Sequence, residues 1–143
     1  MRKTYFLFFL AMIAFSGCST MSREPNSFFI DGRRIDITDS WLARIRTVWA
    51  TSTELTLSSK LKPDDRQWAL DYVALREELK HKCTQLKLLE INKNQTDLDL
   101  TLYGKTFHPI EFNELWVLNS CGTVTSYHVF EDQRILNVVP AKL

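Results

Sequence analysis

The sequence predicts a single α+β domain: an N-terminal hairpin, then two helices packed on a mostly antiparallel sheet. Apolar residues recur with helical spacing only before residue 85, and with the period of two typical of strands after it. The later strand candidates follow one another without intervening helices, which favours α+β over α/β. The 143 residues, 45% of them hydrophobic, have the length and composition of one globular domain.

The domain is expected to begin with a short hairpin over residues 28–37. Asp31-Gly32 separates two runs of apolar and β-branched residues. Asp-Gly is a common two-residue hairpin turn, because glycine accepts a positive φ. The sequence therefore predicts two short antiparallel strands joined by this dipeptide.

Residues after the hairpin predict the first helix. Thr38, Asp39 and Ser40 are of the types that cap helix N-termini. Apolar side chains then recur at helical spacing from Trp41 to Trp49. We expect this helix to end before residues 51–53, and residues 55–62 favour neither helix nor strand.

A second helix is predicted over residues 64–82. Pro63 suits the start of a helix, and the acidic side chains of Asp64 and Asp65 favour the helix dipole there. Apolar residues then follow at steps of three and four, as the stripe of Trp68, Tyr72, Leu75, Leu79 and Cys83. The charged residues of the other face are expected to be solvated: Arg66, Glu77, Glu78, Lys80 and Lys82.

The remaining residues predict strands with one solvated face. A strand starting at Leu86 and a strand over residues 98–102 are expected to form a hairpin around the turn at residues 92–96. Residues 103–105 turn the chain, and Pro109 argues against a central strand there. Further strands are expected over residues 115–119, 123–130 and 134–139.

Residues 1–17 have the three parts of a secretory signal. Arg2 and Lys3 give a basic start, residues 5–15 are all apolar, and Ser16-Gly17 is a small-residue exit. An apolar run of this length is too short to span a bilayer, which takes about 20 residues. We therefore expect residues 1–17 to be a signal peptide that is removed on export.

The exit sequence Phe15-Ser16-Gly17-Cys18 resembles the lipobox of bacterial lipoproteins, although Phe15 replaces the usual aliphatic residue. The resemblance implies that Cys18 becomes the first mature residue and carries a diacylglycerol and an acyl group. Ser19, rather than Asp, then implies an outer-membrane anchor with the domain facing the periplasm. Residues 18–27, which are polar and contain Pro25, would form a flexible tether to the domain at 28–143. The alternative is an ordinary signal-peptidase site with a free Cys18 thiol.

The two other cysteines are expected to form a disulfide. If Cys18 is lipidated, Cys83 and Cys121 remain, and two cysteines in an oxidising periplasm usually pair. Two separate buried thiols are the alternative.

Residues 116–122 form a second local pattern, Trp-Val-Leu-Asn-Ser-Cys-Gly. The segment resembles the Trp-x-Val-x-x-Cys-Gly type found in small uncharacterised proteobacterial lipoproteins, with Leu118 in place of Val. Trp116 lies in a strand whose neighbouring residues, Leu115 and Val117, are also apolar. Either both faces of this strand are buried, or Trp116 lies on a contact surface.

None of three candidate catalytic or metal-binding chemistries is expected. A Cys121 nucleophile with His108 or His128 as base requires a free thiol. A zinc site drawn from His81, Cys83, His108 and His128 lacks a recognised ligand spacing. Four carboxylate pairs are interpreted as solvated surface: Asp64/Asp65, Glu77/Glu78, Asp97/Asp99 and Glu111/Glu114. We expect no enzyme activity, metal or cofactor.

The sequence thus indicates a lipid-anchored accessory or scaffold subunit of an outer-membrane-associated assembly, such as a secretion system. Its partners would be the membrane, through the lipid, and other envelope proteins. A net charge of +1 gives no basic field for nucleic acid. The alternative is a lipoprotein that binds a ligand or inhibits an enzyme, which requires a pocket of several hundred Å3 lined by aromatic residues. A third alternative, an envelope hydrolase, requires a cleft containing His108 or His128 beside a carboxylate.

Overall fold

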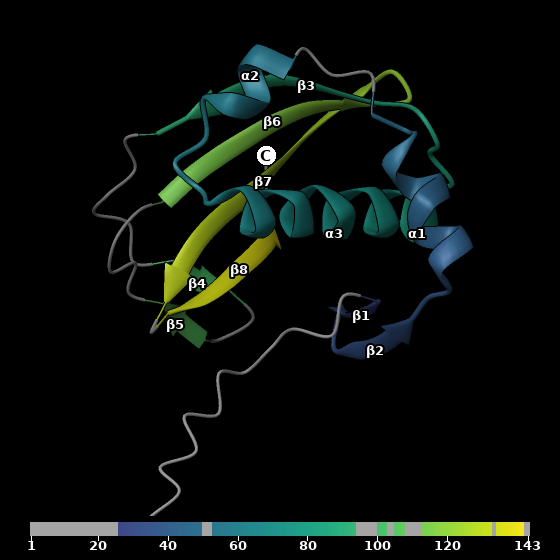
Figure 1. Cartoon of the computed structure of the whole chain (residues 1–143). Helices are drawn as coiled ribbons and strands as arrows, with labels where there is room; N and C mark the ends of the chain where they lie inside the picture. Colours follow the sequence, from purple (N-terminus) through teal and green to yellow (C-terminus); the bar gives the residue numbers. More distant parts are fainter. Residues whose placement is uncertain are drawn as a thin grey trace, which may run out of the picture.

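The structure is a computed structural model that describes residues 26–49, 53–93, 100–102, 105–107, 113–132 and 134–141. Within these residues, helix α3 (Pro63–His81) packs on one face of a four-stranded antiparallel sheet of order β3-β6-β7-β8 (Figure 1). A small hairpin and two shorter helices complete the helical side. The predicted α+β class is confirmed.

The N-terminal hairpin forms as its sequence predicts. Strand β1 (Ser27–Ile30) pairs with β2 (Arg33–Asp36), and Phe28 lies opposite Ile35. The turn residues Asp31 and Gly32 have φ angles of 49° and 78°, which is the left-handed conformation expected of an Asp-Gly turn. Phe28 is buried and stacks on Trp68 of α3, with a ring separation of 5.8 Å.

Helix α1 (Asp39–Arg46) is shorter than its apolar pattern suggests. Thr38 caps the helix, since its hydroxyl accepts a hydrogen bond from the Trp41 N–H at 3.2 Å. The helix ends at Arg46, so Trp49 lies beyond it in an extended segment. Two apolar residues of the predicted pattern, Val48 and Trp49, thus pack on the core without continuing the helix.

Besides the two predicted helices, residues 53–57 form a short third helix. Helix α2 (Thr53–Leu57) has about one and a half turns and lies in the segment before α3. A helix this short has no complete apolar period, and tertiary contacts must hold it in place. The prediction of a long helix at 64–82 is confirmed by α3. The residue that follows it, Lys82, caps the helix in the left-handed conformation, with φ of 54°.

The sheet uses the predicted strands but pairs one of them differently. Strand β3 (Leu86–Asn92) was expected to pair with residues 98–102, but its partner is β6 (Asn113–Ser120). This pairing places Leu86, Leu88 and Ile91 beside the buried side chains of β6, where they join the core. Strands β7 (Thr123–Asp132) and β8 (Ile135–Pro140) complete the sheet as antiparallel neighbours.

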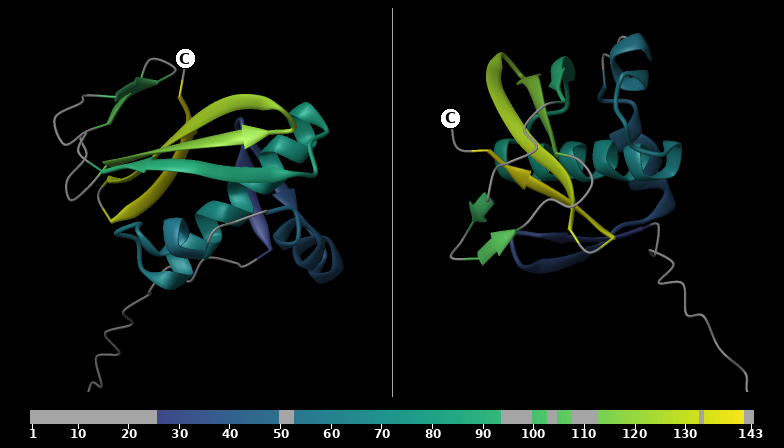
Figure 2. Two further views of the ribbon diagram at one scale, coloured as in Figure 1. Left: turned by 90° about the horizontal axis from the view of Figure 1, so that it is seen from above. Right: turned by 90° about the vertical axis from the view of Figure 1, so that its left-hand side faces the viewer.

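A separate two-stranded hairpin lies on the other side of the sheet. Strand β4 (Leu100–Leu102) pairs with β5 (Lys105–Phe107). Figure 2 shows this pair on the face of the sheet that is turned away from α2. Among the described residues, no helix is both long enough and apolar enough to cross a membrane.

The predicted disulfide is present. The Cα atoms of Cys83 and Cys121 are 5.7 Å apart, and the two sulfur atoms are bonded. Cys83 directly follows the end of α3, and Cys121 lies in the turn between β6 and β7, where its φ is 48°. The disulfide therefore ties the C-terminal end of α3 to one end of the sheet.

Candidate functional site

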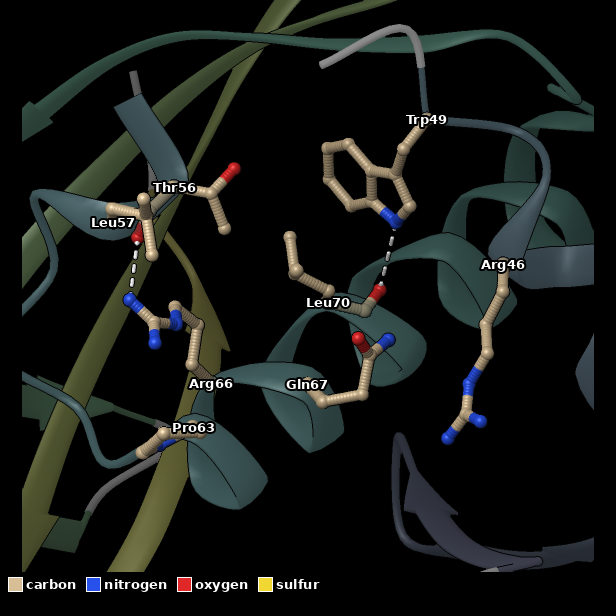
Figure 3. A pocket seen from close by; sticks show the side chains of 8 residues that line it. All are labelled: Arg46, Trp49, Thr56, Leu57, Pro63, Arg66, Gln67 and Leu70. Carbon is tan, nitrogen blue, oxygen red and sulfur yellow. Dashed lines mark hydrogen bonds between the residues drawn. The ribbon is translucent and has the colours of Figure 1, made fainter. Parts of the chain in front are cut away.

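A cavity of about 360 Å3 lies between α2, the first half of α3 and the segment that follows α1 (Figure 3). Its volume is within the range of roughly 300–1,000 Å3 that is typical of small-molecule sites. Aromatic, aliphatic, cationic and amide side chains line it: Arg46, Trp49, Thr56, Leu57, Pro63, Arg66, Gln67 and Leu70. Helices α2 and α3 and the segment at the end of α1 thus leave a concave surface between them.

Trp49 and Leu70 form the central apolar wall of the cavity. The Trp49 indole N–H donates to the main-chain oxygen of Leu70 at 3.3 Å, which fixes the ring against α3 (Figure 3). The backbone beside Trp49 is also held, since the Leu86 N–H donates to the Val48 oxygen at 2.9 Å. The ring is therefore positioned by both α3 and β3, and its face is available for contact with an apolar group.

Arg46 lies at one end of the cavity, and its charge is compensated. Its guanidinium donates to both carboxylate oxygens of Asp71, at 2.7 and 3.1 Å. Gln67 donates to the same carboxylate at 2.9 Å, and the Asp71 side chain is only 3% exposed. The hydrogen bond to Asp71 raises the pKa of Arg46 above its ordinary value. This ion pair joins α1 to α3.

Arg66 lies at the other end and has a different partner. Its Nη1 donates to the main-chain oxygen of Thr56 at 3.0 Å, which ties α3 to α2 (Figure 3). A carbonyl oxygen carries no formal charge, and no carboxylate in the described part of the chain pairs with Arg66. Among the described residues, one guanidinium of the cavity therefore has a counter-charge and the other has none.

Glu114 holds the wall that α2 contributes. This carboxylate accepts hydrogen bonds from Ser59 Oγ at 2.8 Å, from the Lys60 N–H at 2.6 Å and from Trp116 Nε1 at 2.8 Å. The interpretation of Glu114 as a solvated residue is wrong, because its side chain is fully buried. It is the acceptor that a buried indole and a buried loop require.

Trp116 is likewise buried, so its alternative assignment to a contact surface is wrong. Its exposed fraction is 0%, and its side chain points to the helical side of the sheet with Tyr127 opposite. The neighbours Leu115 and Val117 point to the other face, where they are partly buried. Trp116 therefore belongs to the core of the domain.

Glu77 is a second buried carboxylate that was expected to be solvated. It accepts hydrogen bonds from Ser120 Oγ at 2.6 Å and from the Tyr127 hydroxyl, which in turn accepts from Arg76 at 3.1 Å. Burial and the hydrogen bond to Glu77 raise the pKa of Tyr127 above its ordinary value. Glu77 is not among the residues that line the cavity, and its network joins α3 to β6 and β7.

The described residues of the three candidate chemistries are not brought together. Cys121 is bonded to Cys83 and has no free thiol. His81 is exposed at the end of α3, whereas His128 is a half-buried residue of β7. Within the described ranges no group of three or more His, Cys, Asp or Glu side chains could hold a metal ion. Residues predicted for lipidation or chemistry that lie outside the described residues are Cys18, Asp97, Asp99, His108 and Glu111.

The cavity itself was not predicted from the sequence. It exists because α2 closes over the first turns of α3, and the sequence of residues 55–62 does not indicate a helix. Arg66 was assigned to a solvated helical face, which gave no reason to group it with Trp49. The available signal was a tryptophan just beyond a helix end, and that pattern alone does not specify a site.

Comparison with known proteins returns no relative. No family model matches the chain, and no curated protein or solved structure matches it. The chemistry of the cavity and of the disulfide is therefore the basis for the function proposed below.

Proposed function

We propose that this protein is a lipid-anchored envelope protein that acts by binding, as an accessory or scaffold subunit of an outer-membrane-associated assembly such as a secretion system. In this proposal residues 1–17 are removed, and Cys18 carries the lipid. Residues 18–27 then form a flexible tether between the outer membrane and a domain that faces the periplasm. Its partners are the membrane and other envelope proteins.

The observation that carries the proposal is the disulfide between Cys83 and Cys121. Disulfides persist in oxidising compartments such as the periplasm and are rare in the reducing cytosol. A chain that begins with a basic start and an apolar run, and then forms a disulfide in its domain, fits export. The disulfide thus supports the envelope location independently of the lipobox resemblance.

Binding is favoured over catalysis by the side chains that line the cavity. They include two guanidinium groups, a fixed indole and aliphatic side chains, which recognise anionic and apolar groups. None of the lining residues that the structure describes is a His, Cys, Asp or Glu, the usual general bases and metal ligands. Glu77 and Glu114 are fully buried, and their hydrogen bonds join α3 and the loop after α2 to the sheet. Both carboxylates therefore have a structural role.

A second candidate function, a lipoprotein that binds a small ligand or inhibits an enzyme, is favoured by the same cavity. The volume of about 360 Å3 meets the size expected of such a pocket, and Trp49 supplies one aromatic side chain to its lining. In this case the assembly partner would be replaced by a soluble molecule or by an enzyme in the envelope.

Crosslinking in the native envelope tests the accessory function. The full-length lipidated chain is purified after crosslinking, and co-purified proteins are identified by mass spectrometry, with Cys18→Ala as the control. We expect a defined set of envelope proteins that is lost with Cys18→Ala. Recovery of only abundant lipoproteins in both samples would contradict the accessory function and favour the small-ligand candidate.

A further inference from the structure

We infer that the cavity between α1, α2 and α3 binds an apolar group that carries a single carboxylate, with Arg66 pairing with the carboxylate and Trp49 contacting the apolar part. The inference rests on the proposed binding function and names the chemistry that the site recognises. Such a group is found at the carboxyl end of a polypeptide and in free small acids, and the test below separates these two sources.

The charge of the ligand follows from the different states of the two arginines. Arg46 already donates from Nε and Nη2 to Asp71, so its charge is balanced within the domain. Arg66 uses Nη1 for a neutral carbonyl oxygen and has no carboxylate partner among the described residues. An uncompensated guanidinium beside an apolar wall favours an anion, and its planar donor groups match a carboxylate.

One uncompensated cation favours a monoanion over a phosphate. A phosphate group brings up to two negative charges and several acceptor oxygens, and sites that bind it usually supply more than one cation or a series of backbone N–H groups. Here the second guanidinium is already paired with Asp71 at 2.7 Å. A carboxylate needs only the one charge that Arg66 supplies.

The apolar part of the ligand follows from the wall beside Arg66. The indole N–H of Trp49 is taken up by the Leu70 oxygen, so the ring presents its carbon face to the cavity rather than a donor. Leu57, on the α2 side, also lines the cavity and adds an exposed aliphatic side chain to this apolar surface. Figure 3 shows Trp49 and Leu70 between the two arginines, so a group bound at Arg66 would lie against them.

Titration with three matched probes tests this inference. The full-length chain, labelled with 15N-tryptophan in detergent micelles, is titrated with N-acetylphenylalanine, with its uncharged amide, and with 3-phenylpropionate, which lacks the acetamido group. The indole resonance of Trp49, assigned with Trp49→Phe, reports binding. We expect a saturable shift with the acids, and an affinity about tenfold lower for the amide, equivalent to about 1.4 kcal/mol.

Variants assign the effect to Arg66. We expect Arg66→Gln to lower the affinity for the acid about tenfold and to remove the preference over the amide, whereas Arg66→Lys keeps that preference. Arg33→Gln, a change at an exposed arginine of β2, is the control and should bind as the original chain does. Because acid and amide are compared on the unmodified chain as well, the test stands even if Arg66→Gln loosens α2.

The outcomes distinguish a polypeptide end from a free acid as the ligand, and they test the chemistry of the cavity separately from the accessory function. Tighter binding of N-acetylphenylalanine than of 3-phenylpropionate supports a polypeptide end, and the reverse supports a free acid. Equal affinity for acid and amide, or no shift of the Trp49 resonance, would overturn the inference. If crosslinking still captures a lipid-dependent set of partners in that case, only the chemistry of the cavity is wrong and the accessory function stands.

Discussion

Glu114 on β6 and Ser59 in the loop after α2 are joined by a buried hydrogen bond of 2.8 Å, although 55 residues separate them in the chain. The same carboxylate accepts from the Lys60 N–H and from Trp116 Nε1. The bonds from Ser59 and Lys60 attach the segment after α2 to the sheet, and α2 supplies Thr56 and Leu57 to the cavity. The shape of the candidate site thus depends on a carboxylate that does not line it.

Replacement of Glu114 should therefore destabilise the domain and disturb the cavity. We expect Glu114→Ala to lower the free energy of unfolding by roughly 3 kcal/mol, because it leaves buried donors without an acceptor. Urea denaturation followed by circular dichroism measures this change. Glu90→Ala, at an exposed residue of β3, is the matched control. Equal stability of the two variants would show that Glu114 does not hold α2.

The hydrogen bond between Tyr127 and Glu77 should be measurable as a coupling energy. We expect Tyr127→Phe to lower stability by about 2 kcal/mol, since the hydroxyl donates to a buried carboxylate. In a double-mutant cycle with Glu77→Gln, the two changes should be non-additive by about 1 kcal/mol. Additive effects in urea denaturation would indicate that the two side chains stabilise the fold independently.

Loss of the disulfide should weaken the whole domain. With a sequence separation of 38, the chain-entropy model predicts that the Cys83–Cys121 bond contributes about 4 kcal/mol. We expect the Cys83→Ala/Cys121→Ala variant and the reduced original chain to lose a similar free energy of unfolding. Both should therefore have a lower urea midpoint than the oxidised original chain. If reduction leaves the urea midpoint of the original chain unchanged, the cysteines do not constrain the unfolded state as proposed.

Stability should fall in mildly acidic solution because of His128. Burial lowers the pKa of His128 below its ordinary value of 6.5, and its Nδ1 has no hydrogen-bond partner among the residues that the structure describes. Below about pH 6.5 the unfolded chain therefore binds a proton that the folded chain does not, so the free energy of unfolding decreases as the pH falls. Above that pH both states are neutral, and this contribution is constant.

The pH effect is measured by urea denaturation at about pH 7.5 and about pH 5.5, on either side of the ordinary histidine pKa. We expect the loss of stability to be smaller in His128→Gln than in the original chain. His81→Gln, at an exposed residue, should keep the full effect. An identical pH dependence in all three proteins would exclude His128 as its source.

Local patterns were sufficient to predict the elements whose stability comes from a continuous apolar stripe. Helix α3 and strands β6, β7 and β8 could be located because their buried residues repeat over several periods. The Asp31-Gly32 turn and the disulfide were predictable because each depends on residue types with one strong preference.

Features that depend on tertiary contacts were not predictable in the same way. Strand β3 has a pattern that suits several partners, and only the packed core selects β6 over residues 98–102. Glu77 and Glu114 resemble solvated residues in the sequence, because nothing local shows that a tyrosine, a serine or an indole donor will reach them. The cavity depends on α2, which is too short to leave a periodic signal.

Mass spectrometry of the mature N-terminus is the most direct test of the central claim that this protein works from a lipid anchor in the envelope. The chain is purified from the membranes of a Gram-negative host, and its N-terminal peptide is sequenced. The account predicts a peptide that begins at Cys18, with a diacylglyceryl group on the sulfur and an acyl group on the amine. A peptide that begins at Met1, or a processed chain whose Cys18 carries no lipid, would contradict it.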